Sequence, residues 1–89
     1  MVTIRLPTVL RRLASDEAEV PVRAATVQDA MRALADVHPR LGEQLLAGGE
    51  IRPFVRVFLG ANDIQTLDGP QTRLTGDEVL RIVPAIAGG

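Results

Sequence analysis

The sequence contains no cysteine and no lysine, and its ten basic residues are all arginine. Without cysteine there can be no disulfide, no thiolate metal site and no cysteine-bound iron–sulfur cluster. Without lysine or cysteine, none of these 89 side chains offers an amine or a thiol to an activated acyl group. The chain therefore cannot divert such a group onto its own side chains.

Aromatic and catalytic residue types are also scarce. The aromatics are limited to Phe54 and Phe58, which predicts a core built from Val, Ile, Leu and Ala. Ser15 is the only serine and His38 the only histidine, and we interpret His38, just before Pro39, as a helix-end residue. No Ser–His–Asp arrangement, metal-ligand cluster, phosphate loop or nucleotide fingerprint is found. We therefore expect a protein that is not an enzyme by itself and that binds no cofactor or metal.

Length and charge narrow the class further. Eighty-nine residues with 46% hydrophobic and 24% charged side chains are typical of one globular domain. A formal net charge of −1 gives no strong field for nucleic acid or an anionic membrane. No apolar run approaches the ~18 residues that span a bilayer, and the first residues do not resemble a signal peptide. We expect a cytoplasmic protein with neither nucleic acid nor membrane as a partner.

The hydrophobic periodicity predicts an α+β domain. Alternating residues indicate strands at 2–6, 19–23, 54–59 and 79–83, with a possible short strand at 64–67 and turns at 60–63 and 75–77. Pro21 favours an edge position for the second strand. The segment 9–14 is ambiguous, and leucines near residues 41–46 indicate one further helical turn. This order fits a sheet with one main helix across one face.

The main helix is predicted from Thr26 to Val37. The Thr26 hydroxyl can cap the first turn, and Asp29, three residues later, suits that position. An apolar stripe follows at helical spacing: Val27, Ala30, Met31 and Leu34. We expect it to pack on the inward strand residues Val2, Ile4, Leu6, Val55, Val57, Leu80 and Ile82.

The most informative segment is the last one, residues 84–89, which reads Pro84, Ala85, Ile86, Ala87, Gly88 and Gly89. Pro84 cannot continue a central strand, so the domain is predicted to span 1–83 and the tail 84–89. Glycine has no Cβ, and such a tail can thread a narrow channel and place a carboxylate in a partner's active site. The alternative is a frayed terminus whose glycine pair arose by chance. The internal pair Gly48-Gly49 is predicted to be a loop.

The face of the sheet opposite the helix is predicted to be a docking surface. Apolar groups beside arginine suit contact with another protein. The residues expected there are Phe54, Arg56, Phe58, Val79, Arg81 and Val83. Alternatively, a loop or the segment around Arg11 and Arg12 covers this face.

The tail, 82–89, on this order of elements resembles the ubiquitin-like sulfur carrier proteins of the ThiS/MoaD family, most closely the CysO type. The stretches 2–11, 52–57 and 76–79 support that resemblance. It implies a β-grasp fold with Gly89 as the reactive residue. It also implies a partner related to the ubiquitin-activating enzymes, which uses ATP and Mg²⁺ to adenylate Gly89, and a sulfur donor that converts Gly89 to a thiocarboxylate. A sulfur-accepting synthase, for cysteine or another sulfur-containing metabolite, would be the second partner.

Two other functions remain open at this stage. The chain could be the small subunit of molybdopterin synthase, with its tail inserted into a large catalytic partner. It could instead be a ubiquitin-like modifier joined to lysines of other proteins, or an inert β-grasp interaction domain. Neighbouring genes would separate the carrier from the synthase subunit, and higher-mass conjugates in a lysate would indicate the modifier.

Overall fold

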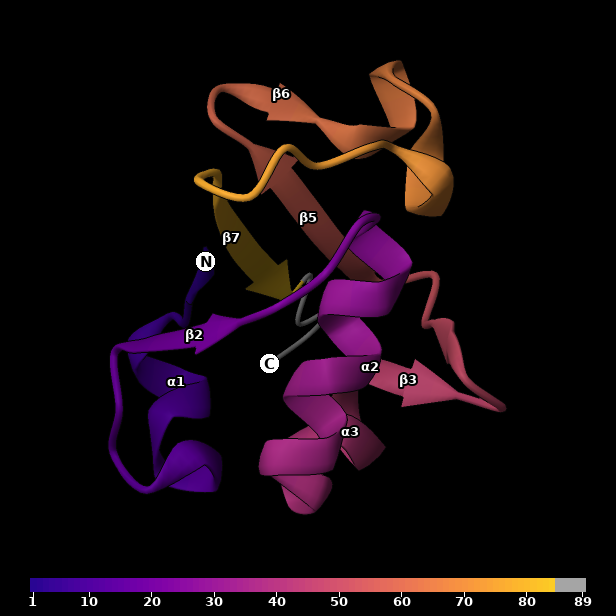
Figure 1. Cartoon of the computed structure of the whole chain (residues 1–89). Helices are drawn as coiled ribbons and strands as arrows, with labels where there is room; N and C mark the ends of the chain where they lie inside the picture. Colours follow the sequence, from indigo (N-terminus) through magenta and orange to yellow (C-terminus); the bar gives the residue numbers. More distant parts are fainter. Residues whose placement is uncertain (85–89) are drawn as a thin grey trace.

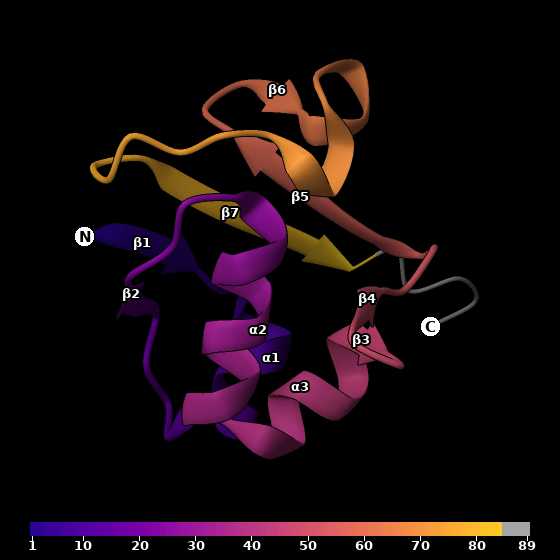
Figure 2. The same cartoon turned by 45° about the vertical axis from the view of Figure 1, so that its right-hand side comes forward.

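A computed structural model describes residues 1–84, which form a mixed sheet with helices packed against one face. The sheet strands, in chain order, are β1 (Val2–Arg5), β2 (Glu19–Val22), β5 (Val55–Leu59), β6 (Asn62–Asp63) and β7 (Val79–Pro84). Their spatial order is β2-β1-β7-β5-β6 (Figure 1; β1 is labelled in Figure 2). β1 and β7 are parallel, and the other pairs are antiparallel. The first and last predicted strands therefore lie side by side, and Pro21 lies on an edge strand as predicted.

The helical layer consists of α1 (Thr8–Arg11), α2 (Val27–Val37) and α3 (Pro39–Leu45) (Figure 2). The Thr26 hydroxyl accepts a hydrogen bond of 3.2 Å from the Asp29 N–H, which confirms the predicted cap. Pro39 ends α2 and also begins α3, because its missing N–H is not needed in a first helical turn. The ambiguous segment after β1 is α1 followed by a 3₁₀ turn, Arg12–Ala14.

The core is aliphatic and lies between α2 and the sheet. The four stripe residues of α2 are all buried. The seven strand residues predicted to face the helix are also buried: Val2, Ile4, Leu6, Val55, Val57, Leu80 and Ile82. Both the inward face of each strand and the helix that covers it are therefore as predicted.

The structure corrects the segment that follows β5. Residues 64–67 were predicted as a possible strand, but Ile64–Thr66 is a 3₁₀ helix, because the Asp63 carboxylate accepts the Gln65 N–H at 2.9 Å and caps the turn. Asn62 and Asp63, predicted as part of a turn, form β6. The turn itself is left to Gly60 and Ala61, with Gly60 at φ 62°.

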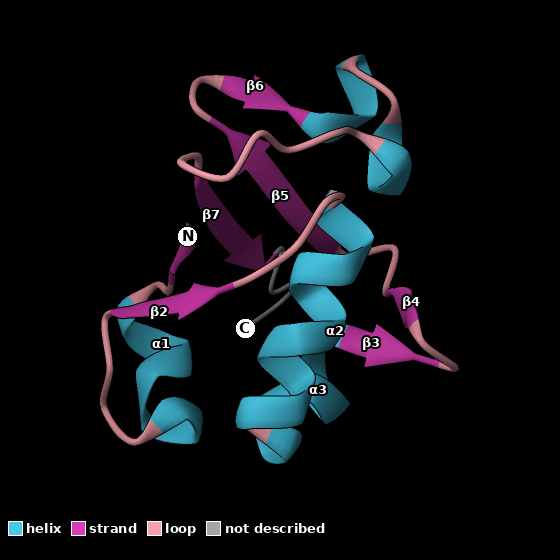
Figure 3. Cartoon of the chain, viewed as in Figure 1, coloured by secondary structure: helices cyan, strands magenta, loops and turns pink. Residues whose placement is uncertain are grey.

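The pair Gly48-Gly49 is a turn, as predicted, but it joins two strands that the sequence did not reveal. These are β3 (Leu46–Ala47) and β4 (Glu50–Ile51), which pair with each other as a separate hairpin (Figure 3). The Gly49 carbonyl accepts hydrogen bonds of 3.2 Å from Gln28 Nε2 and Arg32 Nε of α2. These two bonds tie the hairpin to the helix.

Within residues 1–84, no helix is both long enough and apolar enough to span a membrane.

Candidate functional site

The last strand, β7, ends at a position where it is paired with a neighbouring strand on one side only. β1 pairs with β7 only over Val79–Arg81, whereas β5 pairs with β7 as far as Pro84. Pro84 was predicted to lie outside the last strand, but the strand includes it, opposite Val55. The Val55 N–H donates to the Arg52 carbonyl at 3.0 Å rather than to Pro84. On the other side of β7, the pairing with β1 ends at Arg81, so no β1 residue beside Pro84 needs a hydrogen bond from its nitrogen.

The predicted reactive tail begins at this point. Pro84 is half-buried at the end of β7. The predicted passage residues and the predicted adenylation site lie outside the described residues: Ala85, Ile86, Ala87, Gly88 and Gly89. The structure thus places the attachment of the tail but not its reactive end.

Five of the six predicted docking residues lie on β5 and β7 and share the outer face of the sheet, opposite α2. Phe54, predicted as the first residue of the strand 54–59, lies instead in the turn before β5, which begins at Val55. Phe54, Val79 and Val83 are 49%, 43% and 38% exposed. Arg56 and Arg81 are exposed and Phe58 is half-buried. Arg56 lies across from Val83 and Phe58 across from Arg81, so these four residues are neighbours on the outer face of β5 and β7. The alternative was that a loop or the segment around Arg11 and Arg12 covers this face. In the described residues Val79 and Val83 remain exposed, and that segment packs against the core through Leu10 and Ala14.

One ion pair lies on this outer face and another lies beside it, on β1 and β2. Arg56 Nη1 lies 2.9 Å from Asp63 Oδ2, and Arg5 Nε lies 3.3 Å from Glu19 Oε2. The Gln65 N–H, more than Arg56, holds the pKa of the Asp63 carboxyl below its usual value. Arg81 instead lies over the Phe58 ring, with its Cζ 5.0 Å from the ring centroid. The face therefore combines exposed apolar groups with two guanidinium groups, that of Arg56 paired with a carboxylate and that of Arg81 in contact with an aromatic ring.

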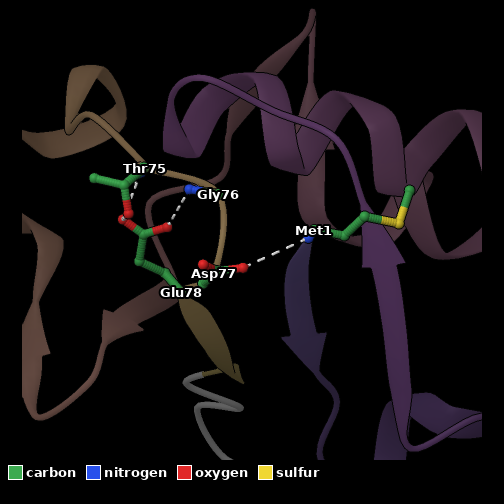
Figure 4. A network of polar contacts seen from close by, with 5 residues as sticks. All are labelled: Met1, Thr75, Gly76, Asp77 and Glu78. Carbon is green, nitrogen blue, oxygen red and sulfur yellow. Dashed lines mark hydrogen bonds and ion pairs between the residues drawn. The ribbon is translucent and has the colours of Figure 1, made fainter.

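A loop at the start of β7 fixes the strand that leads to the tail (Figure 4). The Glu78 carboxylate accepts hydrogen bonds from Thr75 N at 2.6 Å, Thr75 Oγ1 at 3.0 Å and Gly76 N at 2.8 Å. These bonds, chiefly the one from the Thr75 N–H, lower the pKa of Glu78 from 4.5 to about 2. Thr3 N donates to the Glu78 carbonyl at 2.9 Å, which joins this loop to β1. Sequence reasoning found the turn but not the role of Glu78, although a threonine three residues before a glutamate is the available signal.

The bonds to Glu78 predict a pH-dependent stability. Because the pKa is depressed in the folded protein, the stabilisation is complete above the unfolded value of 4.5 and is lost as the pH falls towards about 2. Glu78→Gln should lower the denaturation midpoint at pH 7, and the gap from the native sequence should close near pH 2. Glu43→Gln, at an exposed position of α3, is the matched control. A gap that is the same at both pH values would contradict the assignment.

The remaining polar candidates stay apart from this site. His38 joins α2 to α3, with Nε2 3.5 Å from Glu17 Oε1, and its side chain is 10% exposed. This confirms its interpretation as a helix-end residue. Ser15 lies in the turn after α1 with φ 53°. In residues 1–84, no three His, Asp or Glu side chains come together in a way that could hold a metal ion.

Comparison with known proteins identifies the family. Residues 4–89 match the ThiS family. The chain belongs to the ThiS family. The resemblance inferred from the tail and the order of elements is therefore confirmed, and this family member has the ubiquitin-like β-grasp fold.

Relatives of this ThiS-family chain include carriers and modifiers. Small archaeal modifier protein 3 of Haloferax volcanii is 34% identical over 65 residues, which are 73% of this chain and 71% of that protein. Sulfur carrier protein CysO of Mycobacterium bovis is 25% identical over 91 residues, covering 99% of this chain and 98% of CysO. The crystal structure of the Amycolatopsis orientalis BexX/CysO complex contains a chain with a TM-score of 0.88 and 27% identity, and the match covers 100% of both chains. These relatives are small carrier and modifier proteins.

Proposed function

We propose that this ThiS-family chain is a sulfur carrier whose Gly89 carboxylate is adenylated and then converted to a thiocarboxylate. The observation that carries the proposal is the pair Gly88-Gly89, four and five residues beyond the end of β7, in a chain that belongs to the ThiS family. The match to CysO over nearly its full length supports the same role.

The chemistry follows from the weakness of a carboxylate as an acyl donor. An oxygen of the Gly89 carboxylate attacks the α-phosphorus of ATP, and Mg²⁺-bound pyrophosphate leaves. The resulting acyl adenylate has AMP as a good leaving group. Hydrosulfide then attacks the acyl carbon, and AMP departs with the electrons of the acyl–oxygen bond. The product is a thiocarboxylate with a nucleophilic sulfur. ATP and Mg²⁺ belong to the activating partner, and the acyl carbon belongs to this chain.

The length of the tail determines which part of the domain the partner must contact. Five residues in a fully extended chain span at most about 18 Å, so an active site that holds Gly89 lies within that distance of Pro84. The partner surface must therefore meet the domain beside Pro84, where Phe54 and Val83 are exposed. The outer face and the turn before β5 provide the docking residues Phe54, Arg56, Phe58, Val79, Arg81 and Val83. A sulfur-accepting synthase that receives the same tail meets the same constraint.

Intact-mass spectrometry tests the proposal directly. The full chain is incubated with ATP, Mg²⁺, sulfide and each ubiquitin-activating-type adenylyltransferase encoded in the same genome. We expect a gain of about 16 mass units, the difference between the masses of sulfur and oxygen. Treatment with a thiol-alkylating reagent should then convert this species to one with the mass of the alkylated chain. If no such enzyme adds sulfur to the native chain, the sulfur-carrier role is wrong.

A second candidate function is covalent modification of other proteins, favoured by the 34% identity with Small archaeal modifier protein 3. In that case a lysine amine of the target, rather than sulfide, displaces AMP from the acyl adenylate and forms an amide. Conjugates in a lysate would then increase in mass by one chain for each modified lysine. An affinity-tagged chain that yields thiocarboxylate but no such conjugates excludes this role.

A further inference from the structure

Arg81 differs from the other arginines on the outer face. Arg5 is paired with Glu19 and Arg56 with Asp63, at 3.3 and 2.9 Å. For Arg81, no carboxylate within residues 1–84 lies within ion-pair distance. Its guanidinium is exposed and is held over the Phe58 ring. A positive charge thus lies near the middle of the face with no anion from the described residues beside it.

The neighbours of Arg81 make an incoming anion favourable. Arg5 lies next to it across the parallel pair of β1 and β7, and like charges at adjacent positions of a sheet repel. The Arg81 guanidinium lies over the Phe58 ring, which is an aromatic contact and uses none of its N–H groups, so these stay available to acceptors. The aromatic contact also orders the side chain, so less conformational freedom is lost when an acceptor binds. An oxygen anion in the plane of the guanidinium would satisfy both the charge and the donors.

The surroundings show what kind of anion fits. Val79 and Val83 precede and follow Arg81 on the outer face of β7, and both are exposed. Any protein that buries these valines also takes Arg81 out of water, which is unfavourable unless the guanidinium gains a partner. A carboxylate set among apolar side chains meets both needs, because it forms a two-pronged pair with arginine while its neighbours contact the valines.

We propose that Arg81 is the charged anchor of the docking face and binds an Asp or Glu carboxylate of the activating enzyme, ringed by apolar residues on that enzyme. The identity of the partner rests on the proposed function. The position supports it, since Arg81 lies three residues, or about 10 Å of strand, before Pro84. A partner that draws in the tail therefore lies over Arg81. Arg5 and Arg56 are held by carboxylates of this chain and contribute less.

The test is a binding titration of the full chain with the activating enzyme from the same genome, at low and at high salt. Arg81→Glu should weaken binding by about 30-fold or more, as expected when a hydrogen-bonded interfacial charge pair is lost. Arg81→Gln should weaken it less and reduce its salt dependence. Arg40→Glu, an equal change of charge at an exposed position of α3, should bind as the native chain does. Thermal denaturation checks that each variant is folded.

The outcomes separate this inference from the proposed function when sulfur addition is measured in the same mixtures. If the native chain gains sulfur and folded Arg81→Glu and Arg81→Gln bind as tightly as it does, the anchor is wrong and the carrier role stands. If binding depends on Arg81 but no sulfur is added, the anchor stands and the carrier chemistry is wrong. If the native chain binds no activating enzyme, both are overturned. An Asp→Arg or Glu→Arg change in the enzyme that restores binding of Arg81→Glu would identify the partner residue.

Discussion

Gly88→Val is expected to reduce thiocarboxylation of the chain by at least about 100-fold, the scale of loss when reacting atoms are misplaced by about 1 Å. A passage that admits glycine admits only backbone, and the branched Cβ of valine widens the chain immediately before the reacting carboxyl group. Intact-mass spectrometry with the activating enzyme, ATP and sulfide measures the fraction of chain that gains sulfur.

Two matched variants make this result specific. Ala85→Gly removes a methyl group from the tail at a position far from the reacting carboxyl group, and this variant should retain sulfur addition. A chain extended by one residue after Gly89 should not react, because its carboxyl group lies one residue too far along. The denaturation midpoint of Gly88→Val should remain near that of the native chain, since the proposed role of the tail is to enter a partner and not to stabilise the domain. Equal sulfur addition to all of these chains would contradict a terminal glycine mechanism.

Periodicity was sufficient to predict the main architecture from the sequence. Alternation in β1, β5 and β7 assigned each apolar side chain to the correct face, because one face of each strand is buried and the other is not. The helix start at Thr26 followed from a local cap, which needs only neighbouring residues. Signals of this kind are local, and sequence reasoning recovers them well.

Several features that depend on contacts between distant segments were not predicted. Gly42 lies in α3, and from the sequence alone a glycine in a helix is only a weak helix former. In the structure, a Cβ placed on Gly42 would lie 2.5 Å from the Ala35 Cβ of α2. That glycine allows the two helices to approach. The β3–β4 hairpin is likewise held by Gln28 and Arg32 of α2, so two-residue strands with little pattern of their own are stable there.

In the candidate site, too, local features were predicted and features that depend on the pairing of strands were not. The outer-face positions on β5 and β7 followed from alternation, and Val79 and Val83 are exposed there, whereas Phe54 lies in the turn before β5 rather than in the strand. The ion pair between Arg56 and Asp63 and the aromatic contact of Arg81 depend on cross-strand register, which the sequence alone did not define. The register also explains why Pro84 remains in β7, since β1 has ended before that position.

Leu34→Ala is expected to lower the free energy of unfolding by roughly 2–5 kcal/mol, the range for removing a buried leucine side chain. Leu34 is fully buried on the face of α2 that meets the sheet. Alanine is at least as good a helix former as leucine, so the loss reports packing rather than helix propensity. Such a loss is a large fraction of the ~5–15 kcal/mol that stabilises a typical domain.

Chemical denaturation of Leu34→Ala is compared with two other variants. Leu67→Ala removes a leucine that is 43% exposed and should cost much less. Deleting Gly88 and Gly89 removes no side chain beyond hydrogen and should leave the midpoint almost unchanged. A carrier needs this difference, because a tail that enters a partner's active site cannot also be required to stabilise the domain. If the deletion lowered the midpoint as much as Leu34→Ala, the two glycines would belong to the fold, and their proposed role as the reactive end of a sulfur carrier would lose its physical basis.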